Sequence, residues 1–124
     1  MKHTINWNGY EVDVDPEDRV AIMPDNGREV ALMFMPGVPC PIMISVSGTS
    51  PTWRWNGDKK APTFSPSILT RLPWGEGGGE VVNHVFIRDG KIQYLTDCSH
   101  EYAGKCIELP KLSEWPEEFI LWDD

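Results

Sequence analysis

Four Asn-Gly or Asp-Gly pairs, each next to β-favouring residues, limit what this chain can fold into more than any other feature. They lie at positions 8–9, 26–27, 56–57 and 89–90. Such pairs favour two-residue type I′ turns, because both central residues of that turn need a positive φ. Eleven glycines and eleven prolines divide the chain further into short pieces, which disfavours long helices. The chain is therefore expected to fold as a series of β-hairpins.

About ten short segments around these turns have the composition of strands. They are residues 4–7, 10–14, 20–23, 29–35, 41–46, 52–55, 63–69, 81–88, 91–96 and 105–109. Their spacing predicts an all-β fold, mainly antiparallel hairpins in a small barrel or sandwich with at most one short helix. The length fits a single β-rich domain over residues 1–124. Residues 113–124 form an acidic and hydrophobic C-terminal tail that suits a short helical turn or a final strand equally well.

The formal net charge of −8 argues against direct binding to nucleic acid, because phosphate contacts need Lys and Arg. The acidic residues cluster at positions 11–18 and 114–124. These clusters form either a solvated surface or an acidic face that binds a basic partner. No apolar stretch is long enough to span a bilayer, and the first residues do not resemble a signal peptide. The three cysteines lack disulfide spacing. These observations predict no membrane partner and a cytoplasmic location.

The hairpin that turns at Asp89-Gly90 carries an unusual group of polar side chains. A two-residue turn pairs Arg88 with Lys91, and counting back from there places His84 opposite Leu95. Because strand side chains alternate between faces, His84 and Asp97 then become diagonal neighbours on one face. A three-residue turn with a bulge would shift the register by one residue and separate them.

Cys98 and His100 follow this hairpin, and together with His84 they suggest a zinc site. Imidazole, thiolate and carboxylate are the protein ligands of zinc. Two trios are candidates: His84, Cys98 and His100, or His84, Asp97 and His100. Cys40 would add a fourth ligand if its strand lies adjacent. In the alternative interpretation, His84 is a hydrogen-bonded strand residue, Cys98 is a small buried residue and Asp97 caps a turn.

A second polar and aromatic patch contains the two tryptophans of the 52–55 strand and the hydroxyl side chains after Pro62: Trp53, Trp55, Thr63, Ser65 and Ser67. Prolines interrupt the second segment, so it is expected at a sheet edge. One interpretation is an aromatic core covered by a rigid edge. The other is a ligand-binding platform, which would stack against a flat molecule or bind a peptide strand added at that edge.

Several motifs resemble an uncharacterised family of small bacterial and phage proteins, some of which carry the label "ammonia monooxygenase". The motifs are Trp53-x-Trp55-x-Gly57, Pro62-Thr63-x-Ser65-Pro66-Ser67-Ile68, His84-x-Phe86-x-x-x-Gly90-x-Ile92-x-Tyr94 and Tyr94-Leu95-x-Asp97-Cys98-x-His100-x-x-Ala103-Gly104. The resemblance covers roughly residues 30 to 110 and implies a compact β-rich fold and, in many members, a bound zinc. A cysteine cluster found in some relatives is reduced here to Cys40, and Asn83 stands near the place of another cysteine. The zinc ligands that the resemblance leaves are Cys40, His84, Cys98 and His100.

Three functional hypotheses follow. The first is a small acidic protein of a phage or mobile element that binds a host protein, for example to inhibit a defence system. The second is a metal-dependent hydrolase, in which Asp97 or Glu101 acts as the catalytic base on a zinc-bound water. The third is a small-ligand binder that uses the Trp53 and Trp55 platform.

Overall fold

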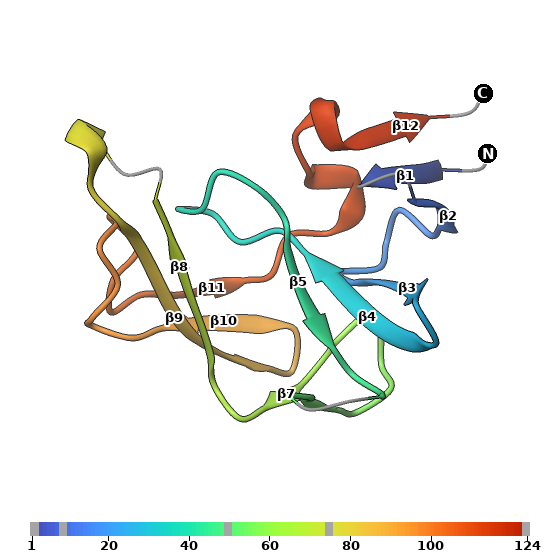
Figure 1. Ribbon diagram of the computed structural model, residues 1–124, viewed down its shortest axis with the longest axis horizontal. Coiled ribbons are helices and arrows are strands. Elements are labelled where there is room, and N and C mark those ends of the chain that lie inside the picture. Colours follow the sequence, from blue (N-terminus) through green and yellow to red (C-terminus); the bar gives the residue numbers. More distant parts are fainter. Residues whose placement is uncertain (1–2, 8–9, 49–50, 74–75, 123–124) are drawn as a thin grey trace.

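The computed structural model describes residues 3–7, 10–48, 51–73 and 76–122, and in these residues the chain is built from short antiparallel strands (Figure 1). The strands are β1 (His3–Trp7), β2 (Tyr10–Val14), β3 (Ala21–Asp25), β4 (Arg28–Met33), β5 (Ile42–Ser45), β6 (Arg54–Trp55), β7 (Phe64–Ser65), β8 (Ile68–Leu72), β9 (Val81–Arg88), β10 (Lys91–Tyr94), β11 (Cys106–Glu108) and β12 (Ile120–Trp122). The helical elements among the described residues are single 3-10 turns, η1 (Glu76–Gly78), η2 (Leu112–Glu114) and η3 (Glu117–Phe119). The predicted all-β class is confirmed.

The strands form four antiparallel sheets, with the orders β12-β1-β2, β3-β4-β5, β6-β7 and β11-β10-β9-β8. In Figure 1 the four-stranded sheet lies at the left and the β12-β1-β2 sheet at the upper right, with β3 and β4 below the latter and β5 near the centre. The β3-β4-β5 sheet contributes side chains to the apolar core from both of its faces. Its strand β4 is correspondingly buried over four consecutive residues, Val30 to Met33.

Two apolar clusters form the core, and β4 contributes to both of them. Ala31 and Met33 belong to the larger cluster, together with Val85, Ile87, Ile92 and Tyr94 of the four-stranded sheet. Val30 and Leu32 belong to the smaller cluster, together with Ile5, Ala21, Met23, Leu112 and Trp115. This division follows from strand geometry, because successive side chains point to opposite faces.

Two of the four expected tight turns are confirmed. Asn26-Gly27 joins β3 to β4 and Asp89-Gly90 joins β9 to β10, and all four residues have positive φ, between 48° and 80°. The Asn8-Gly9 pair lies outside the described residues. The prediction for Asn56-Gly57 is wrong: residues 56–63 form a wide loop, since Trp55 pairs with Phe64. The Asn56 side chain organises this loop by accepting hydrogen bonds from the backbone N–H groups of Asp58 and Thr63.

The expected strand over residues 63–69 is divided into β7 and β8 by Pro66 and Ser67. Proline has no N–H to donate to a strand ladder, which accounts for the interruption. Ser67 therefore stands just before the first residue of β8, outside regular pairing.

The C-terminal tail packs against the rest of its own chain. Leu112 and Trp115 are buried in the smaller cluster, and β12 pairs with β1. Asp123 and Asp124, which belong to the predicted tail, lie outside the described residues. No helix in the described part of the chain has the length and hydrophobicity needed to cross a membrane, and the cytoplasmic location stays a prediction.

Lysine side chains pair with part of the first acidic cluster. The Lys60 ammonium lies 3.1 Å from Asp15 and 3.0 Å from Asp18, and Lys111 lies 2.8 Å from Glu17. These pairs connect the segment after β2 to the loop at residues 56–63 and to the start of η2. The pairs with Asp15 and Glu17 are exposed to solvent, and such pairs contribute little to stability individually. They do show that these three carboxylates are engaged within the chain.

Candidate active site

The β9–β10 hairpin has the register that the two-residue turn predicted. Arg88 pairs with Lys91 and Val85 with Tyr94, and the Leu95 N–H donates to the His84 carbonyl at 2.9 Å. One face of β9 is buried through Asn83, Val85 and Ile87. His84 lies on the other face, where its Nδ1 is 2.9 Å from Oδ2 of Asp97. The predicted proximity of the His84 and Asp97 side chains is confirmed.

Ser67 completes a hydrogen-bonded series with these two residues. Strand β8 pairs antiparallel with β9, with Ile68 opposite Val85 and Leu69 opposite His84. This pairing brings Ser67, one residue before β8, to the Nε2 side of the imidazole, where its Oγ lies 3.1 Å from Nε2. The His84 ring therefore bridges a hydroxyl on one side and a carboxylate on the other.

The carboxylate determines how protons are arranged in this series. The hydrogen bond from His84 lowers the pKa of Asp97 below its ordinary value, so Asp97 is ionised at neutral pH. An ionised carboxylate only accepts hydrogen bonds. His84 Nδ1 must then carry the proton that it shares with Asp97. In the neutral imidazole Nε2 is left without a proton, and it accepts the hydrogen bond from the Ser67 hydroxyl.

Trp53 and Cys98 fix the backbones of two members of the series. The Trp53 indole N–H donates to the Ser67 carbonyl at 3.2 Å. The Cys98 sulfur contacts the backbone of His84 twice, accepting from its N–H and donating to its carbonyl, both at 3.3 Å. Cys98 is buried, so these contacts lie in a protected environment. Both residues act on the site by positioning it.

The residues predicted to form a ligand platform have separate roles. Trp53 and Trp55 pack against the larger core cluster, and Trp55 stacks on Phe64 with ring centroids 6.5 Å apart. The Thr63 hydroxyl accepts from the Asp89 N–H at 2.9 Å and so holds the β9–β10 turn. Ser65 is exposed. For the two tryptophans, the structure agrees with the interpretation of an aromatic core covered by an edge segment. Ser67 instead faces His84.

The described residues do not bring the predicted zinc ligands together. His100 bonds through Nε2 to Oδ1 of Asn83 at 2.8 Å, and Asn83 is buried on the opposite face of β9 from His84. Cys98 is occupied with the His84 backbone. Within the described ranges, no three His, Cys, Asp or Glu side chains are grouped to hold a metal ion.

The two remaining predicted residues lie apart from the His84 face. Cys40 borders an apolar pocket with Pro41, Ile42 and Leu72, and burial raises the pKa of its thiol. Glu101 is exposed in the turn after His100, and its charge acts on the His100 imidazole. Neither position supports the ligand or base role that the zinc hypothesis gave it.

Stability is expected to fall on mild acidification because of His100. Its Nδ1 accepts from the Tyr102 N–H at 3.2 Å while Nε2 bonds to Asn83, an arrangement that requires a neutral ring. Burial lowers the pKa of His100 from 6.5, although the nearby Glu101 opposes this shift. Below pH 6.5 the unfolded chain therefore binds a proton that the folded chain does not, and the free energy of unfolding decreases as pH falls. Denaturant titrations between pH 7.5 and 5.5 measure this slope.

The His100→Gln variant isolates the contribution of this ring from those of the other histidines. Its free energy of unfolding should depend less on pH than that of the wild-type protein over the same range. Equal slopes in the two proteins would show that His100 is protonated to the same extent in the folded and unfolded states.

The hydroxyl–imidazole–carboxylate series has the geometry of the catalytic triad of serine hydrolases, in which a base bonded to the nucleophile is oriented by a third group. A model of the family described as bacterial ubiquitination-like system serine protease (BubE) matches residues 7–95. The match covers most of the chain, and the chain belongs to this family. Comparisons with curated proteins and with solved structures found no match.

Family membership corrects two of the expectations drawn from sequence. The resemblance rightly indicated a small bacterial domain, but the matching family is the BubE proteases and its description does not include zinc. The hypothesis of a phage or mobile-element protein that binds and inhibits a host protein is wrong, because the family is one of proteases. Sequence reasoning missed Ser67 as part of a triad because no G-x-S-x-G motif surrounds it.

Proposed function

We propose that this protein is a serine protease, with Ser67 as nucleophile, His84 as general base and acid, and Asp97 as the group that orients His84. The observation that carries the proposal is the pair of hydrogen bonds through one imidazole ring, 3.1 Å to Ser67 and 2.9 Å to Asp97. The family description supports a protein substrate that belongs to a ubiquitination-like system. Partners are accordingly protein substrates.

The geometry supports the usual two-step acyl transfer. His84 Nε2 removes the Ser67 hydroxyl proton as Oγ attacks the scissile carbonyl carbon, and Asp97 stabilises the imidazolium. The imidazolium then gives this proton to the leaving amine nitrogen, and an acyl-enzyme ester on Ser67 remains. A water molecule attacks the ester after losing a proton to His84. That proton returns to Ser67 Oγ as the acid product leaves.

The exposure of the triad suits a macromolecular substrate. The Asp97 side chain is 58% exposed and the His84 side chain 25% exposed. His84 belongs to the outer face of the four-stranded sheet, whose inner face is covered by the core, and Asp97 lies in the turn that follows β10. A chain segment of another protein can therefore approach Ser67 without any large rearrangement.

Labelling with a fluorophosphonate tests the proposal, because this reagent reacts covalently with activated serines. One adduct is expected, and peptide mass spectrometry should place it on Ser67. Ser65→Ala is the matched control, since Ser65 is exposed two residues away and bonds to no triad member in the described structure. The control should label at the wild-type rate. Labelling at another residue, or none, would refute the proposed nucleophile.

Cys98 is expected to matter for catalysis through the His84 backbone. Cys98→Ala removes both sulfur contacts, so the imidazole should lose its exact position and kcat should fall by roughly tenfold to a hundredfold. KM should change little, because Cys98 is buried beneath the site. Cys98→Ser keeps a donor and an acceptor at this position and should restore most of kcat. A loss of thermal stability with unchanged kcat in Cys98→Ala would show that the contacts are only structural.

A further inference from the structure

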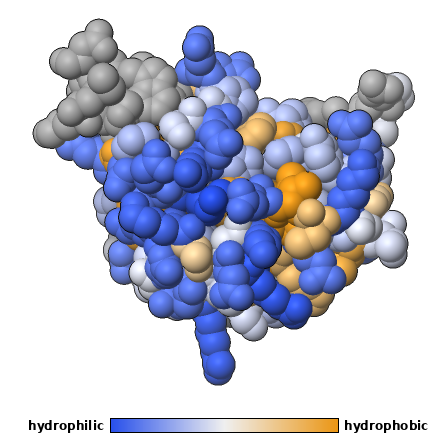
Figure 2. All heavy atoms as spheres, turned by 180° about the vertical axis from the view of Figure 1, so that it is seen from behind, coloured by the Kyte–Doolittle hydropathy of each residue, from blue (hydrophilic) through white to orange (hydrophobic). Residues whose placement is uncertain are grey.

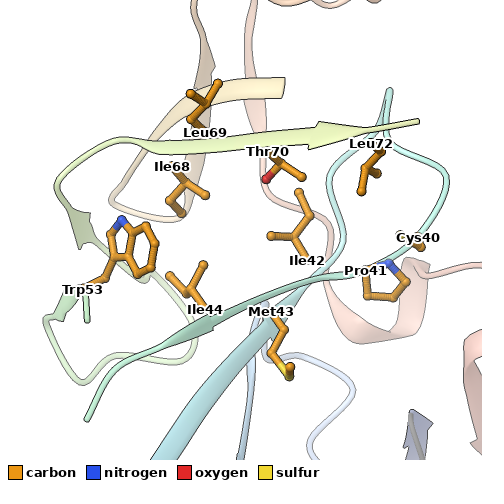
Figure 3. A pocket seen from close by; sticks show the side chains of 10 residues that line it. All are labelled: Cys40, Pro41, Ile42, Met43, Ile44, Trp53, Ile68, Leu69, Thr70 and Leu72. Atoms are coloured by element: carbon orange, nitrogen blue, oxygen red, sulfur yellow. The ribbon is translucent and has the colours of Figure 1, made fainter. Parts of the chain in front are cut away.

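An apolar groove lies between strands β5 and β8, next to the proposed nucleophile (Figure 3). Its volume is about 230 Å³, and none of its lining residues is charged. The lining residues are Cys40, Pro41, Ile42, Met43, Ile44, Trp53, Ile68, Leu69, Thr70 and Leu72. The groove therefore favours an aliphatic or aromatic occupant.

The groove runs along the edges of both strands. Figure 3 shows Ile68 and Thr70 pointing toward β5 while Leu69 points away, and Ile42 and Ile44 pointing toward β8 while Met43 points away. Since alternate residues belong to opposite faces, a groove bordered by consecutive residues of a strand follows that strand's edge. Strands β5 and β8 are each the last strand in their sheet among the described residues. An unpaired edge offers backbone N–H and C=O groups to a further strand.

Exposed hydrophobic side chains mark the same place. Among residues whose burial is described, the large hydrophobic side chains that are exposed are Met43, at 37%, and Leu69, at 48%. Both border the groove. On the face shown in Figure 2, hydrophilic side chains dominate and hydrophobic residues gather in one area. Exposed apolar side chains therefore flank the groove, one on each of its two strands.

The groove adjoins the chain segment that carries the proposed nucleophile. Ile68, which lines it, directly follows Ser67 in the chain. Trp53 forms one wall and also donates its indole N–H to the Ser67 carbonyl. The backbone N–H of Trp53 bonds to the Ser45 carbonyl at 2.8 Å and so closes the β5 edge at that end. A segment that lies along β8 in this groove reaches Ser67 just before the first residue of the strand.

We propose that the groove binds an extended segment of the protein substrate as an added strand along β8, with aliphatic side chains entering between β5 and β8. This inference rests on the proposed protease function and assigns its substrate class: an unstructured segment that carries aliphatic residues beside the scissile bond. Backbone hydrogen bonds to the β8 edge supply affinity, and the apolar lining supplies specificity.

The added strand predicts a periodicity of two along the substrate. Side chains at alternate positions enter the groove, so Asp should be rejected at those positions and tolerated between them. Backbone N–H groups also alternate in direction, so N-methylation should impair cleavage at every second residue. Internally quenched decapeptides, with each position in turn Leu, Asp or N-methylated, measure both patterns. We expect kcat/KM to change at least tenfold between neighbouring positions.

Thr70→Glu is the test on the enzyme side, since the Thr70 side chain points toward β5, lines the groove and bonds to no triad member in the described structure. It should raise KM for the Leu-containing peptides at least tenfold and leave fluorophosphonate labelling of Ser67 unchanged. Thr70→Val should retain wild-type kinetics. Ser113→Glu, which adds the same charge at an exposed position in η2 outside the groove, should do so too.

These readouts separate the two proposals. Failure to label Ser67 in the wild-type protein refutes the protease function. When Ser67 is labelled normally, any of three results refutes the groove alone: no decapeptide is cleaved, Leu and Asp peptides are cleaved equally, or Thr70→Glu behaves as the wild type.

Discussion

Ser67→Ala is expected to lower kcat for peptide hydrolysis by at least about 10⁴-fold, because it removes the oxygen that forms the acyl bond. The bond that this oxygen makes in the described structure is to His84 Nε2, at the surface of the four-stranded sheet. Stability should therefore stay within about 0.5 kcal/mol of the wild-type value. Cleavage of an internally quenched peptide and a thermal denaturation curve measure the two quantities on the same preparation.

The exposed neighbour Ser65 provides the matched control for this variant. Ser65→Ala makes the same chemical change two residues earlier and should keep at least half of the wild-type kcat. Turnover by Ser67→Ala within tenfold of the wild type would mean that another residue is the nucleophile.

Asp97→Asn is expected to lower kcat by about 10⁴-fold while the fold is retained. The amide of Asn can donate a hydrogen bond to Nδ1, which favours the tautomer with the proton on Nε2. That tautomer cannot accept the Ser67 proton. The variant also lacks the negative charge that stabilises the imidazolium. Steady-state kinetics between pH 6 and 9 measure the loss, and the hydrogen bond that lowers the pKa of Asp97 keeps the wild-type carboxylate charged throughout.

Asp89→Asn is the control for Asp97→Asn, because it neutralises another exposed aspartate of the same hairpin. Asn tolerates the positive φ of 51° at that turn position, so activity should be unchanged. If Asp97→Asn keeps kcat within tenfold of the wild type, Asp97 only caps the turn and the triad assignment is wrong.

The local hairpin of the site could be predicted because its register depends on one turn. Asp89-Gly90 fixes the pairing of Arg88 with Lys91, and simple alternation then places His84 beside Asp97. This result needs only residues close together in the chain, where turn chemistry and strand periodicity are sufficient.

The role of Ser67 could not be predicted, because it depends on the pairing of β8 with β9 across residues 73–80. The chain order of the triad, Ser then His then Asp, also differs from the three familiar orders of serine hydrolases. Sequence reasoning did name all three residues, but it assigned Ser67 to a ligand platform, His84 to a zinc site and Asp97 to a catalytic base or a zinc ligand. Pro66 interrupts the expected strand just before Ser67. This interruption was the sequence feature that could have linked Ser67 to His84 and Asp97.

The predicted zinc ligands do not converge, because they lie on different faces of the sheet. His84 and His100 are close in the chain, but the turn after Asp97 carries His100 to the buried side, where Asn83 and Tyr102 bind it. Composition and spacing do not report on which side of a sheet a turn residue lies. Asn56-Gly57 failed for a similar reason, since its side-chain hydrogen bonds stabilise a wide loop that propensity does not reveal.

The different surroundings of the three free thiols have a practical consequence for spectroscopy. Cys106 is exposed on β11, Cys98 is buried, and burial raises the pKa of Cys40. Thiolates are the reactive form, so a maleimide dye at neutral pH should attach first to Cys106. The native chain thus offers a single attachment point on the catalytic sheet, from which a fluorescent reporter can follow substrate arrival without any engineered cysteine.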